Sequence, residues 1–390
     1  MNHEFYMRRA LALAAKGAGW VCPNPQVGAL VVRDGEIIGE GYHTRCGNLH
    51  AEREALADCV RKGNSPAGAT IYVTLEPCCH TGKQPPCTEA LVEAGIARVV
   101  MGAPDPNPLV AGKGIAQLRA AGIKVIEGVL VEECQRVNRA WLHFIQTKRP
   151  FVTLKYAMTL DGKTATHTGS SQWITGEVAR QRVHEDRAKT AAILVGVGTV
   201  IADNPQLTAR PKGNHNPHQP SRIVIDPTLR TPLGALLVQR ASEVPTVIAC
   251  APGANPEKRA ALETQGCEVW EIPATRCSKD TEGRCTLSTQ LDLGALLDRM
   301  GDEGIDSLVV EGGAKTAGAF LDAGLIDCVQ AYIAPKLVGG NSALSPIGGG
   351  GIELMGDAMT FAETSMEILG DDVLVTAYRR PAGAREGDTS

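Results

Sequence analysis

A histidine, two cysteines and a glutamate occur in this chain at the spacing expected of a catalytic zinc site. His50-Ala51-Glu52 is followed by Pro77-Cys78 and then by Cys87. One imidazole and two thiolates leave the fourth position of a tetrahedral zinc ion open for water, which is typical of catalytic rather than structural sites. Glu52 could reach that water without binding the metal. Hydrolytic deamination of an amino-substituted heterocycle requires this set of groups.

Simpler roles exist for each of these side chains. The cysteines could fill apolar space and the histidine could cap a helix, and any one of them alone would favour such a role. Their combination with the glutamate and the proline favours a catalytic site. A structural zinc site stays open as an alternative, because Cys79 or His80 could supply a fourth ligand.

Length and composition indicate a globular protein of two domains. The chain has 390 residues, 43% of them hydrophobic and 21% charged, and a formal net charge of −4. This length exceeds what a single core usually holds. Because no long Lys/Arg run is present, we expect no nucleic-acid partner, although a small basic pocket could hold one phosphate.

The cysteines and the apolar segments favour a cytoplasmic location. The 12 cysteines are scattered along the chain, so reduced thiols are expected rather than a disulfide framework. Residues 1–20 resemble a signal peptide only superficially, because Glu4 precedes the arginines and the apolar residues fit one helix face. No apolar stretch approaches the length needed to cross a bilayer, so no membrane partner is expected.

Apolar periodicity predicts an α/β protein in two parts. In the first part, helices are expected at 3–17, 50–61, 87–94, 114–121 and 131–145, and strands at 27–32, 36–42, 69–75, 98–101 and 124–127. In the second, helices are expected at 178–189, 256–265, 293–301 and up to residue 321, and strands at 151–155, 192–195, 222–225, 246–249, 268–270, 307–310, 328–334 and 372–378, the last two antiparallel.

The polar segment 146–150 separates these two parts, so we expect domains at 1–147 and 151–380. Two further segments, 211–220 and 273–286, are expected to be surface loops. Cys277 and Cys285 in the second loop are expected to be ordinary thiols, because no histidine or further cysteine pair accompanies them.

Two further motifs extend the zinc pattern. Pro23-Asn-Pro-Gln-Val-Gly28 lies near the start, and Thr74-Leu-Glu-Pro-Cys78-Cys-His80-Thr-Gly-Lys-Gln-Pro-Pro-Cys87 contains both cysteines. The chain thereby resembles the bifunctional deaminase–reductases of riboflavin biosynthesis, from about Glu4 to Tyr378. The resemblance implies a cytidine-deaminase-like α/β/α domain with one zinc ion, which deaminates a phosphorylated pyrimidine ribosylamine to the corresponding uracil.

The same resemblance assigns roles in the first part of the chain. His50, Cys78 and Cys87 would bind zinc, and Glu52 would be the catalytic proton carrier. Asn24 and His43 would help to hold the pyrimidine ring, while His80 and Lys83 would lie near the ring or the phosphate. From the residues alone, Lys83 could equally be a solvated lysine.

The second part lacks a G-x-G-x-x-G motif, so a Rossmann domain is not supported. Ser307-Leu-Val-Val-Glu311-Gly-Gly-Ala-Lys-Thr316 instead predicts a strand, a glycine turn and a helix start, whose amides could bind phosphate. A tight turn that binds no phosphate is the simpler interpretation. Arg187 and Arg210 could hold a phosphorylated sugar and Trp173 could lie against a flat ring, or each could be an ordinary ion pair or core aromatic residue.

Resemblance to the reductase half of the same family implies a dihydrofolate-reductase-like α/β domain that uses NADPH. Lys155 would lie beside the reacting sugar carbon as a catalytic residue. The residues that would contact NADPH are Ala157, Trp173, Thr199, Asp203, Gly313, Ala314, Lys315, Thr316, Ala317, Gly318 and Ala319. The residues that would hold the ribosylamino substrate are Ser171, Arg187, Leu207, Arg210 and Glu311. The sequence does not decide between NADPH and NADH.

The hypothesis is thus a cytoplasmic, zinc- and NADPH-dependent enzyme that performs two consecutive steps and forms a homo-oligomer, a dimer or a tetramer. One rival is a deaminase of nucleic-acid bases, against which the acidic charge balance and the eight residues between the cysteines argue. A rival of another class is a zinc-stabilised protein whose second half merely senses a nucleotide.

Overall fold

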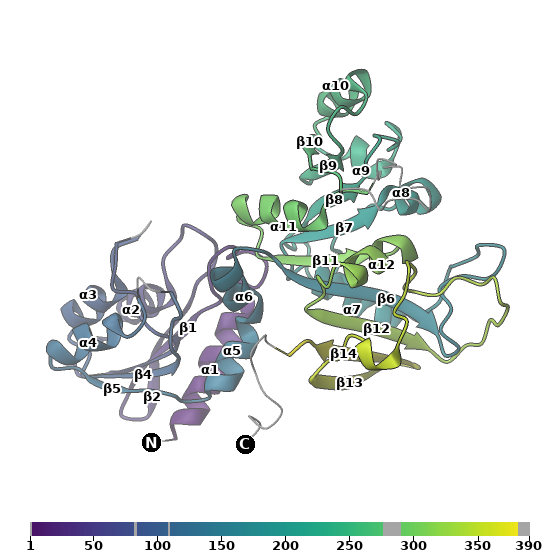
Figure 1. The fold of residues 1–390 in the computed structure, drawn as a ribbon. Helices are drawn as coiled ribbons and strands as arrows, with labels where there is room; N and C mark the ends of the chain where they lie inside the picture. The colour runs from purple at the N-terminus through teal and green to yellow at the C-terminus, as the bar shows by residue number, and fades with distance from the viewer. Residues whose placement is uncertain (1, 82–83, 108–109, 276–289, 381–390) are drawn as a thin grey trace. The chain divides into compact units, whose positions relative to one another are not determined.

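The computed structural model describes residues 2–81, 84–107, 110–275 and 290–380. The chain divides into two compact units, one ending at Arg149 and the other beginning at Pro150 (Figure 1). Each unit contains one β-sheet of its own, with five strands in the first and nine in the second. No helix among the described residues is both long enough and apolar enough to span a membrane.

The sheet of the first unit has the strand order β2-β1-β3-β4-β5. β1 pairs antiparallel with β2 and β3, whereas β4 lies parallel to β3 and β5. Its strands are β1 (Gly28–Arg33), β2 (Glu36–Tyr42), β3 (Thr70–Leu75), β4 (Arg98–Ala103) and β5 (Lys124–Ile126). Its helices are α1 (His3–Ala14), η1 (Ala15–Gly17), α2 (Ala51–Arg61), α3 (Cys87–Glu93), α4 (Lys113–Ala120), α5 (Val131–Val137) and α6 (Arg139–Thr147).

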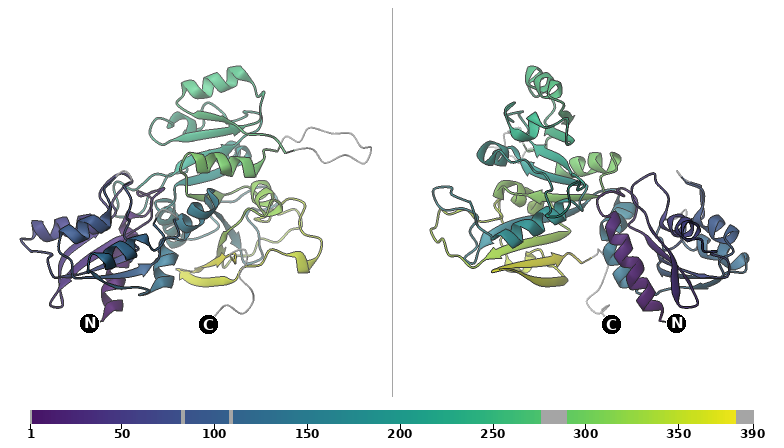
Figure 2. Two further views of the ribbon diagram at one scale, coloured as in Figure 1. Left: turned by 60° about the vertical axis from the view of Figure 1, so that its left-hand side comes forward. Right: turned by 180° about the vertical axis from the view of Figure 1, so that it is seen from behind.

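Helices cover both faces of this sheet (Figures 1 and 2). Apolar residues of α2, α3 and α4 pack with alternate residues of β1, β3 and β4 into one core. Residues of α1, α5 and α6 pack with the other alternate residues into a second core. Every residue of β3 is buried, as expected for a central strand covered on both sides. The unit is therefore an α/β/α sandwich.

One helix prediction in this unit is wrong in its extent. The expected helix at 131–145 is two helices, α5 and α6, which meet at Asn138. The Asn138 side chain is bonded to the backbone of Gln26: its Oδ1 accepts from the Gln26 N–H at 2.7 Å and its Nδ2 donates to the Gln26 carbonyl at 2.9 Å. This tertiary contact interrupts the helix at a place that local periodicity does not reveal.

The sheet of the second unit has the order β10-β9-β8-β7-β11-β6-β12-β14-β13. All neighbours from β10 to β12 are parallel, and the last two strands run antiparallel. Its strands are β6 (Phe151–Thr159), β7 (Ala192–Gly196), β8 (Ser221–Ile225), β9 (Thr246–Cys250), β10 (Glu268–Glu271), β11 (Ser307–Glu311), β12 (Cys328–Ala334), β13 (Glu363–Leu369) and β14 (Asp372–Tyr378). Its helices are α7 (Glu177–Arg187), α8 (Val197–Asp203), α9 (Leu236–Gln239), α10 (Pro256–Thr264), α11 (Leu293–Asp302), α12 (Ala314–Asp322) and η2 (Met355–Asp357).

Four elements of the second unit, α8, α9, η2 and β13, are absent from the sequence prediction. The helices are short, and β13 is an edge strand that exposes six of its seven residues, so it has no buried stripe to reveal it. The other predicted helices and strands are present, with small shifts at their ends. The predicted loop at 211–220 contains no helix or strand, whereas 276–289, with Cys277 and Cys285, lies outside the described residues.

Candidate functional site

Three potential metal ligands converge in the first unit from separate parts of the chain. His50 immediately precedes α2, Cys78 follows β3, and Cys87 is the first residue of α3. The His50 Nδ1 atom lies 3.5 Å from Cys78 Sγ and 3.4 Å from Cys87 Sγ. The ligand atoms of all three residues lie within 4.8 Å of one another. These are the donor atoms and the spacing that zinc needs.

Within the described residues, the group of potential ligands contains no fourth member, and neither Cys79 nor His80 joins the three. A zinc ion held by His50, Cys78 and Cys87 would therefore keep one position open for a small molecule. This arrangement favours the catalytic alternative over the structural one.

Local hydrogen bonds favour a thiolate at Cys78. Bonds from Cys87 and His50 lower the pKa of Cys78 to about 4, against the effect of burial. One of these bonds is donated by the Cys87 backbone N–H to Cys78 Sγ, at 3.3 Å. The pKa of Cys87 is raised instead, by its contact with the Cys78 thiolate and by burial. A bound divalent cation would favour the thiolate form of both cysteines.

Glu52 lies in the first turn of α2, beside the three ligands but outside their group. Its side chain is buried, with 4% of the residue exposed. Burial, together with the nearby Cys78 thiolate, raises the pKa of Glu52 to about 7. A carboxyl group with such a pKa can both accept and donate a proton near neutral pH.

Asn24 and His43 form a fixed pair next to His50. The His43 Nδ1 lies 3.0 Å from the Leu49 carbonyl, so it carries the proton and donates. His43 Nε2 therefore accepts from Asn24 Nδ2 at 3.0 Å. Burial lowers the pKa of His43, which keeps the ring neutral in this arrangement. The His43 and His50 rings meet edge to face with centroids 5.4 Å apart.

His80 lies in the segment between the two cysteines. Its Nδ1 atom is buried and has no hydrogen-bond partner among the described residues. Lys83 lies outside the described residues.

The sequence analysis missed two buried carboxylates close to the zinc ligands. Glu76 accepts backbone N–H groups of Asp105, Gly112 and Ile115 at 3.4, 3.1 and 3.4 Å, which ties the segment leading to Cys78 to the start of α4. Asp105 follows β4 and is 8% exposed; burial raises its pKa to about 6. A polar residue directly after a buried parallel strand was the available signal for Asp105.

In the second unit, the expected substrate residues Arg187 and Glu311 form a buried ion pair beside Lys155. Arg187 donates from Nε and from a terminal nitrogen to the two carboxylate oxygens of Glu311, at 2.8 and 2.6 Å. Lys155 Nζ lies 3.8 Å from Glu311 Oε2. Although burial opposes it, the two cations lower the pKa of Glu311 to about 2. Burial lowers the pKa of Lys155, an effect that Glu311 partly offsets.

Arg187 also connects this ion pair to the segment that follows α8. Its NH1 donates to the Thr208 carbonyl at 3.1 Å, and His184 Nδ1 lies 3.2 Å from the same oxygen. The Arg210 guanidinium lies 3.4 Å from His184 Nε2. Arg187 and Arg210 therefore both lie near His184. Burial and these two arginines lower the pKa of His184 to about 4.

The expected glycine turn is present between β11 and α12. Gly312 and Gly313 have φ angles of 72° and 83°, which favour glycine. A Cβ atom at Gly313 would lie 3.2 Å from Thr199 Oγ1, and one at Gly196 would lie 2.5 Å from Thr316 Oγ1. The starts of α8 and α12 thus meet at the ends of neighbouring parallel strands. An open turn of this kind fits the phosphates of a dinucleotide such as NADPH.

The remaining expected contact residues are more widely distributed. Ala157 lies on β6, on the same face as Lys155. Ser171 and Trp173 lie in the segment before α7; the Trp173 ring is 64% exposed and lies 4.6 Å from the Arg180 guanidinium. Asp203 is the exposed last residue of α8. The remaining expected cofactor residues, Ala314, Lys315, Ala317, Gly318 and Ala319, lie in α12.

Leu207 is buried and offers little of its side chain to any ligand near Arg210. Its side chain is 4% exposed and belongs to an apolar core with residues of β7, β8 and α9. Its φ angle of 51° is unusual for a branched residue.

Comparison with known proteins gives matches over nearly the whole chain. Residues 1–103 match the cytidine and deoxycytidylate deaminase zinc-binding region, and residues 150–375 match the RibD C-terminal domain. The chain is 49% identical over 370 residues to the riboflavin biosynthesis protein RibD of Actinobacillus pleuropneumoniae, covering 95% of this chain and 93% of that protein. It is 41% identical to RibD of Escherichia coli, over 96% of this chain and 98% of that protein.

Solved structures give the same result. A diaminohydroxyphosphoribosylaminopyrimidine deaminase/5-amino-6-(5-phosphoribosylamino)uracil reductase from Thermotoga maritima is 38% identical with a TM-score of 0.82, covering 97% of this chain and 99% of that one. RibD of Acinetobacter baumannii is 36% identical with a TM-score of 0.83, over 96% of this chain and 98% of that one.

These matches confirm the predicted fold class, a cytidine-deaminase-like domain followed by a dihydrofolate-reductase-like domain. They also confirm the predicted cofactors, because a zinc-binding deaminase region precedes an NADPH-using reductase domain. The chain is a bifunctional enzyme, a zinc-dependent deaminase and an NADPH-dependent reductase, and it belongs to the RibD family of riboflavin biosynthesis proteins.

Proposed function

We propose that the first unit, over residues 1–147, deaminates a phosphorylated diaminohydroxypyrimidine ribosylamine to the corresponding uracil. The observation that carries this proposal is the convergence of His50, Cys78 and Cys87 within 4.8 Å, with no fourth ligand among the described residues and a buried glutamate beside them. The similar enzyme of Thermotoga maritima is named for this substrate class.

Glu52 is the proton carrier of this half-reaction. A zinc ion held by His50, Cys78 and Cys87 would supply a nucleophilic water near neutral pH. Glu52 would accept a proton from the attacking water and donate it to the departing amino group, so that oxygen replaces nitrogen on the ring and ammonia leaves. Asn24 and the neutral His43 hold the ring, while His80 and Lys83 lie near the ring or the phosphate. These positions are supported by the Asn24–His43 hydrogen bond of 3.0 Å and by the buried His80 Nδ1, which has no hydrogen-bond partner in the described part of the chain.

Removing the metal is expected to stop the first reaction and spare the second. A chelator such as dipicolinate should abolish ammonia release, and added zinc should restore it. NADPH oxidation with the deaminated substrate should continue, because the reductase residues belong to the other unit. Circular dichroism measured in parallel checks that the first unit stays folded; its unfolding on chelation would favour a structural metal.

We further propose that residues 151–380 reduce the ribosyl group of the deaminated product to a ribityl chain. Bound NADPH would supply a hydride to the sugar carbon, while the bond from that carbon to the ring oxygen breaks and the oxygen takes a proton from solvent. The protein would mainly hold the two reacting carbons together. Lys155 contacts the sugar beside that carbon. Ser171, Arg187, Arg210 and the backbone of Leu207 hold the phosphorylated sugar, and Glu311 orients Arg187 and Lys155. The bonds between Arg187 and Glu311 support this arrangement.

The residues assigned to NADPH include the turn between β11 and α12. Gly313 to Ala319, together with Thr199 and Asp203 of α8, would hold the cofactor. Ala157 and Trp173 would also contact it. The positive φ angles of Gly312 and Gly313, at a turn whose backbone carries no side chain, support the close approach of backbone and ligand.

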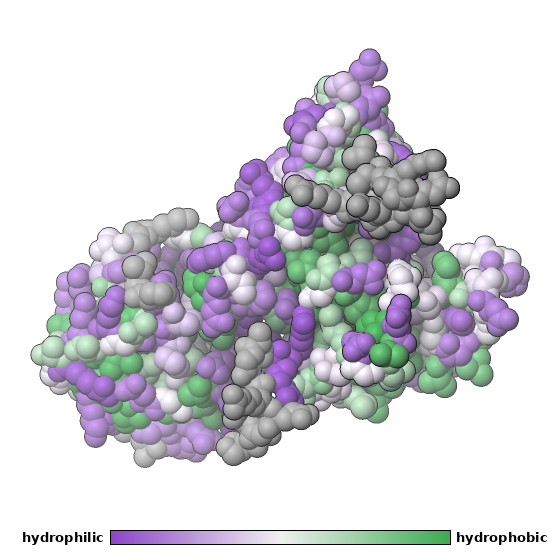
Figure 3. All heavy atoms as spheres, in the orientation of Figure 1, coloured by the Kyte–Doolittle hydropathy of each residue, from purple (hydrophilic) through white to green (hydrophobic). Residues whose placement is uncertain are grey.

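We propose that the protein forms a homo-oligomer through its second unit. β13 ends the nine-stranded sheet, and Met366 and Ile368 on it are 76% and 79% exposed. A long apolar edge strand favours pairing with another chain. The face drawn in Figure 3 carries hydrophobic patches among hydrophilic side chains. Replacing Met366 and Ile368 with lysine is expected to reduce the mass measured by light scattering to that of a smaller assembly; an unchanged mass would exclude this surface.

We propose a cytoplasmic location without nucleic-acid or membrane partners. Several cysteines of the described residues are free thiols, which fits a reducing compartment: Cys59, Cys78, Cys87, Cys134, Cys250 and Cys267. Recovery of the enzyme in the soluble fraction of lysed cells, without release by osmotic shock, tests this location.

A further inference from the structure

Lys155 lies between a carboxylate and an aromatic ring. Its Nζ is 3.8 Å from Glu311 Oε2 and 5.5 Å from the centre of the Tyr332 ring. β6 lies between β11 and β12, and Lys155 is in register with Glu311 on one side and Gln330 on the other. Tyr332 comes two residues after Gln330 and therefore lies on the same face of the sheet.

The Tyr332 ring is important for Lys155 because the Glu311 carboxylate is already bonded to Arg187. Arg187 donates to both oxygens of Glu311, at 2.8 and 2.6 Å, so Lys155 has only a longer contact with one of them. A buried ammonium group needs further stabilisation. The π face of Tyr332 supplies it within the usual distance of a cation–π contact, without using any of the three N–H donors of Lys155. Those donors remain available to a substrate.

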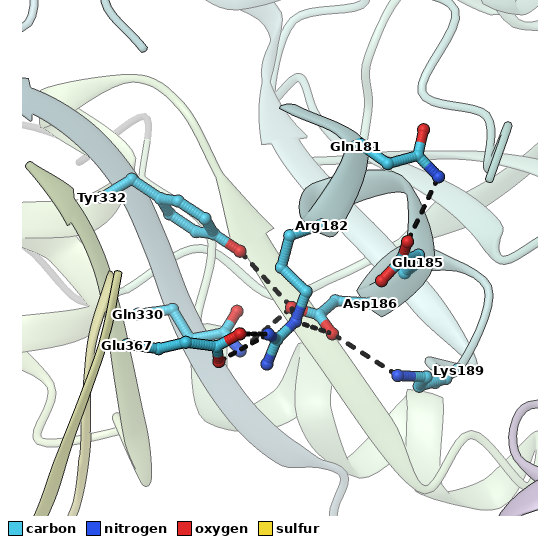
Figure 4. Close-up of polar contacts among 8 residues, drawn as sticks. All are labelled: Gln181, Arg182, Glu185, Asp186, Lys189, Gln330, Tyr332 and Glu367. Atoms are coloured by element: carbon cyan, nitrogen blue, oxygen red, sulfur yellow. Dashed lines mark hydrogen bonds and ion pairs between the residues drawn. The ribbon is translucent and has the colours of Figure 1, made fainter. Parts of the chain in front are cut away.

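The Tyr332 ring is fixed at its hydroxyl end. The hydroxyl donates to Asp186 Oδ2 at 3.3 Å, and Tyr332 is 1% exposed. Asp186 also accepts from Arg182 Nε at 3.1 Å, and Arg182 NH1 donates to both carboxylate oxygens of Glu367 at 2.7 and 2.6 Å. Figure 4 shows this series of contacts, which runs from β12 through the last turn of α7 to β13.

We propose that Tyr332 is a positioning residue of the reductase site, which holds the Lys155 ammonium group in place through its ring face. Asp186 fixes the ring by accepting its hydroxyl, and Arg182 with Glu367 fixes Asp186. The proposal rests on the role proposed above for Lys155. Tyr332 does not contact the substrate; it acts through Lys155 alone.

A double-mutant cycle in the full-length enzyme tests this proposal. Tyr332→Met keeps apolar bulk but removes the ring, whereas Tyr332→Phe keeps the ring and removes only the hydroxyl. Each is made alone and together with Lys155→Met, and kcat is measured by NADPH oxidation with the deaminated substrate. Tyr156→Phe, which lies on the opposite face of β6 from Lys155, is the matched control and should behave as the unchanged enzyme.

The expected kcat values distinguish the contribution of the Tyr332 ring from that of its hydroxyl group. Tyr332→Met should lower kcat about tenfold, with the KM for NADPH nearly unchanged, whereas Tyr332→Phe should lower kcat no more than about threefold. When Lys155→Met is already present, Tyr332→Met should have no further effect, because the residue through which it acts is gone. Thermal unfolding of each variant shows whether it is folded; if Tyr332→Met does not fold, the coupling of Tyr332→Phe to Lys155→Met decides.

Three results would contradict the proposal in distinguishable ways. An equal loss of kcat with and without Lys155 would show that Tyr332 acts independently and would overturn this inference alone. A loss in Tyr332→Phe as large as that in Tyr332→Met would show that the ring face is not what holds Lys155. An unchanged kcat in Lys155→Met would remove the proposed role of Lys155 and this inference with it.

Discussion

Replacing Glu52 with glutamine is expected to lower the deaminase turnover by about a thousandfold. Glutamine keeps the size of the side chain but can neither take a proton from water nor give one to the leaving amine. The buried position of Glu52, beside His50, Cys78 and Cys87, leaves little room for bulk solvent to replace it. Ammonia release at saturating substrate measures the effect.

Two further measurements distinguish lost proton transfer from a lost site. Zinc content by atomic absorption should stay near one ion per chain, because Glu52 is not among the ligands. NADPH oxidation with the deaminated substrate should also be unchanged. The matched control is Glu54→Gln on the same helix turn, whose side chain is 25% exposed and faces Arg61; it should retain full deaminase activity. Loss of zinc from the Glu52 variant, or unaltered deamination, would contradict the assigned role.

Replacing Glu311 with glutamine is expected to destabilise the second unit and to abolish most of the reductase activity. The carboxylate lies between Arg187 and Lys155 and its side chain is 8% exposed. Loss of one partner from a buried ion pair typically costs about 3 to 5 kcal/mol, because the remaining charges are left uncompensated. Arg187 and Lys155 would also lose their orientation, so we expect kcat to fall by about a hundredfold. Urea unfolding and NADPH oxidation measure the two effects.

The pH dependence of stability gives an independent check of this ion pair. The pKa of Glu311 falls from 4.5 to about 2 in the folded protein, although burial acts in the opposite direction. A depressed carboxyl pKa contributes stability that is fully present above pH 4.5 and is lost as the pH falls through about 2. The contribution is on the order of 3 kcal/mol at neutral pH.

Glu311→Gln should therefore flatten the part of the stability curve below pH 4.5. Glu303→Gln is the matched control, because Glu303 pairs with Arg299 at the surface with 44% of its side chain exposed. Glu303→Gln should change the free energy of unfolding by no more than about 0.5 kcal/mol. Identical acid-unfolding curves for the wild-type enzyme and Glu311→Gln would show that the pair does not act as described.

The zinc ligands could be predicted because the sequence immediately around each of them indicates its position. His50 opens a helix, Cys78 follows an apolar strand and Cys87 begins the next helix, so residue type and neighbouring periodicity indicate the same positions. Glu76 carries no such signal, and Asp105 is marked only by its place after a buried parallel strand. Their partners lie up to 39 residues away along the chain, and only the folded sheet and the start of α4 bring them together.

Less of the second unit could be predicted from the local sequence pattern. The strand, glycine turn and helix around Gly312 were predicted correctly. The residues beside Lys155 depend on the register of β11, β6 and β12, which join segments more than 150 residues apart. The hydrophobic pattern within one strand does not specify its neighbours, so Tyr332 and Asp186 carried no signal in the sequence. Edge strand β13 was missed because its apolar side chains face outward.

The junction at Asn138 limits how the first unit can tolerate insertions and deletions. Asn138 lies between α5 and α6 and holds both backbone polar groups of Gln26, two residues after Asn24. One residue added within α5 would rotate everything after it by about 100° around the helix axis, carrying the asparagine away from Gln26. The segment that carries Asn24, which is proposed to hold the pyrimidine ring, would then lose its hydrogen bonds to Asn138. Helices that are distant from the zinc ligands in the sequence are therefore expected to have the same length in related proteins. Their exposed residues can differ.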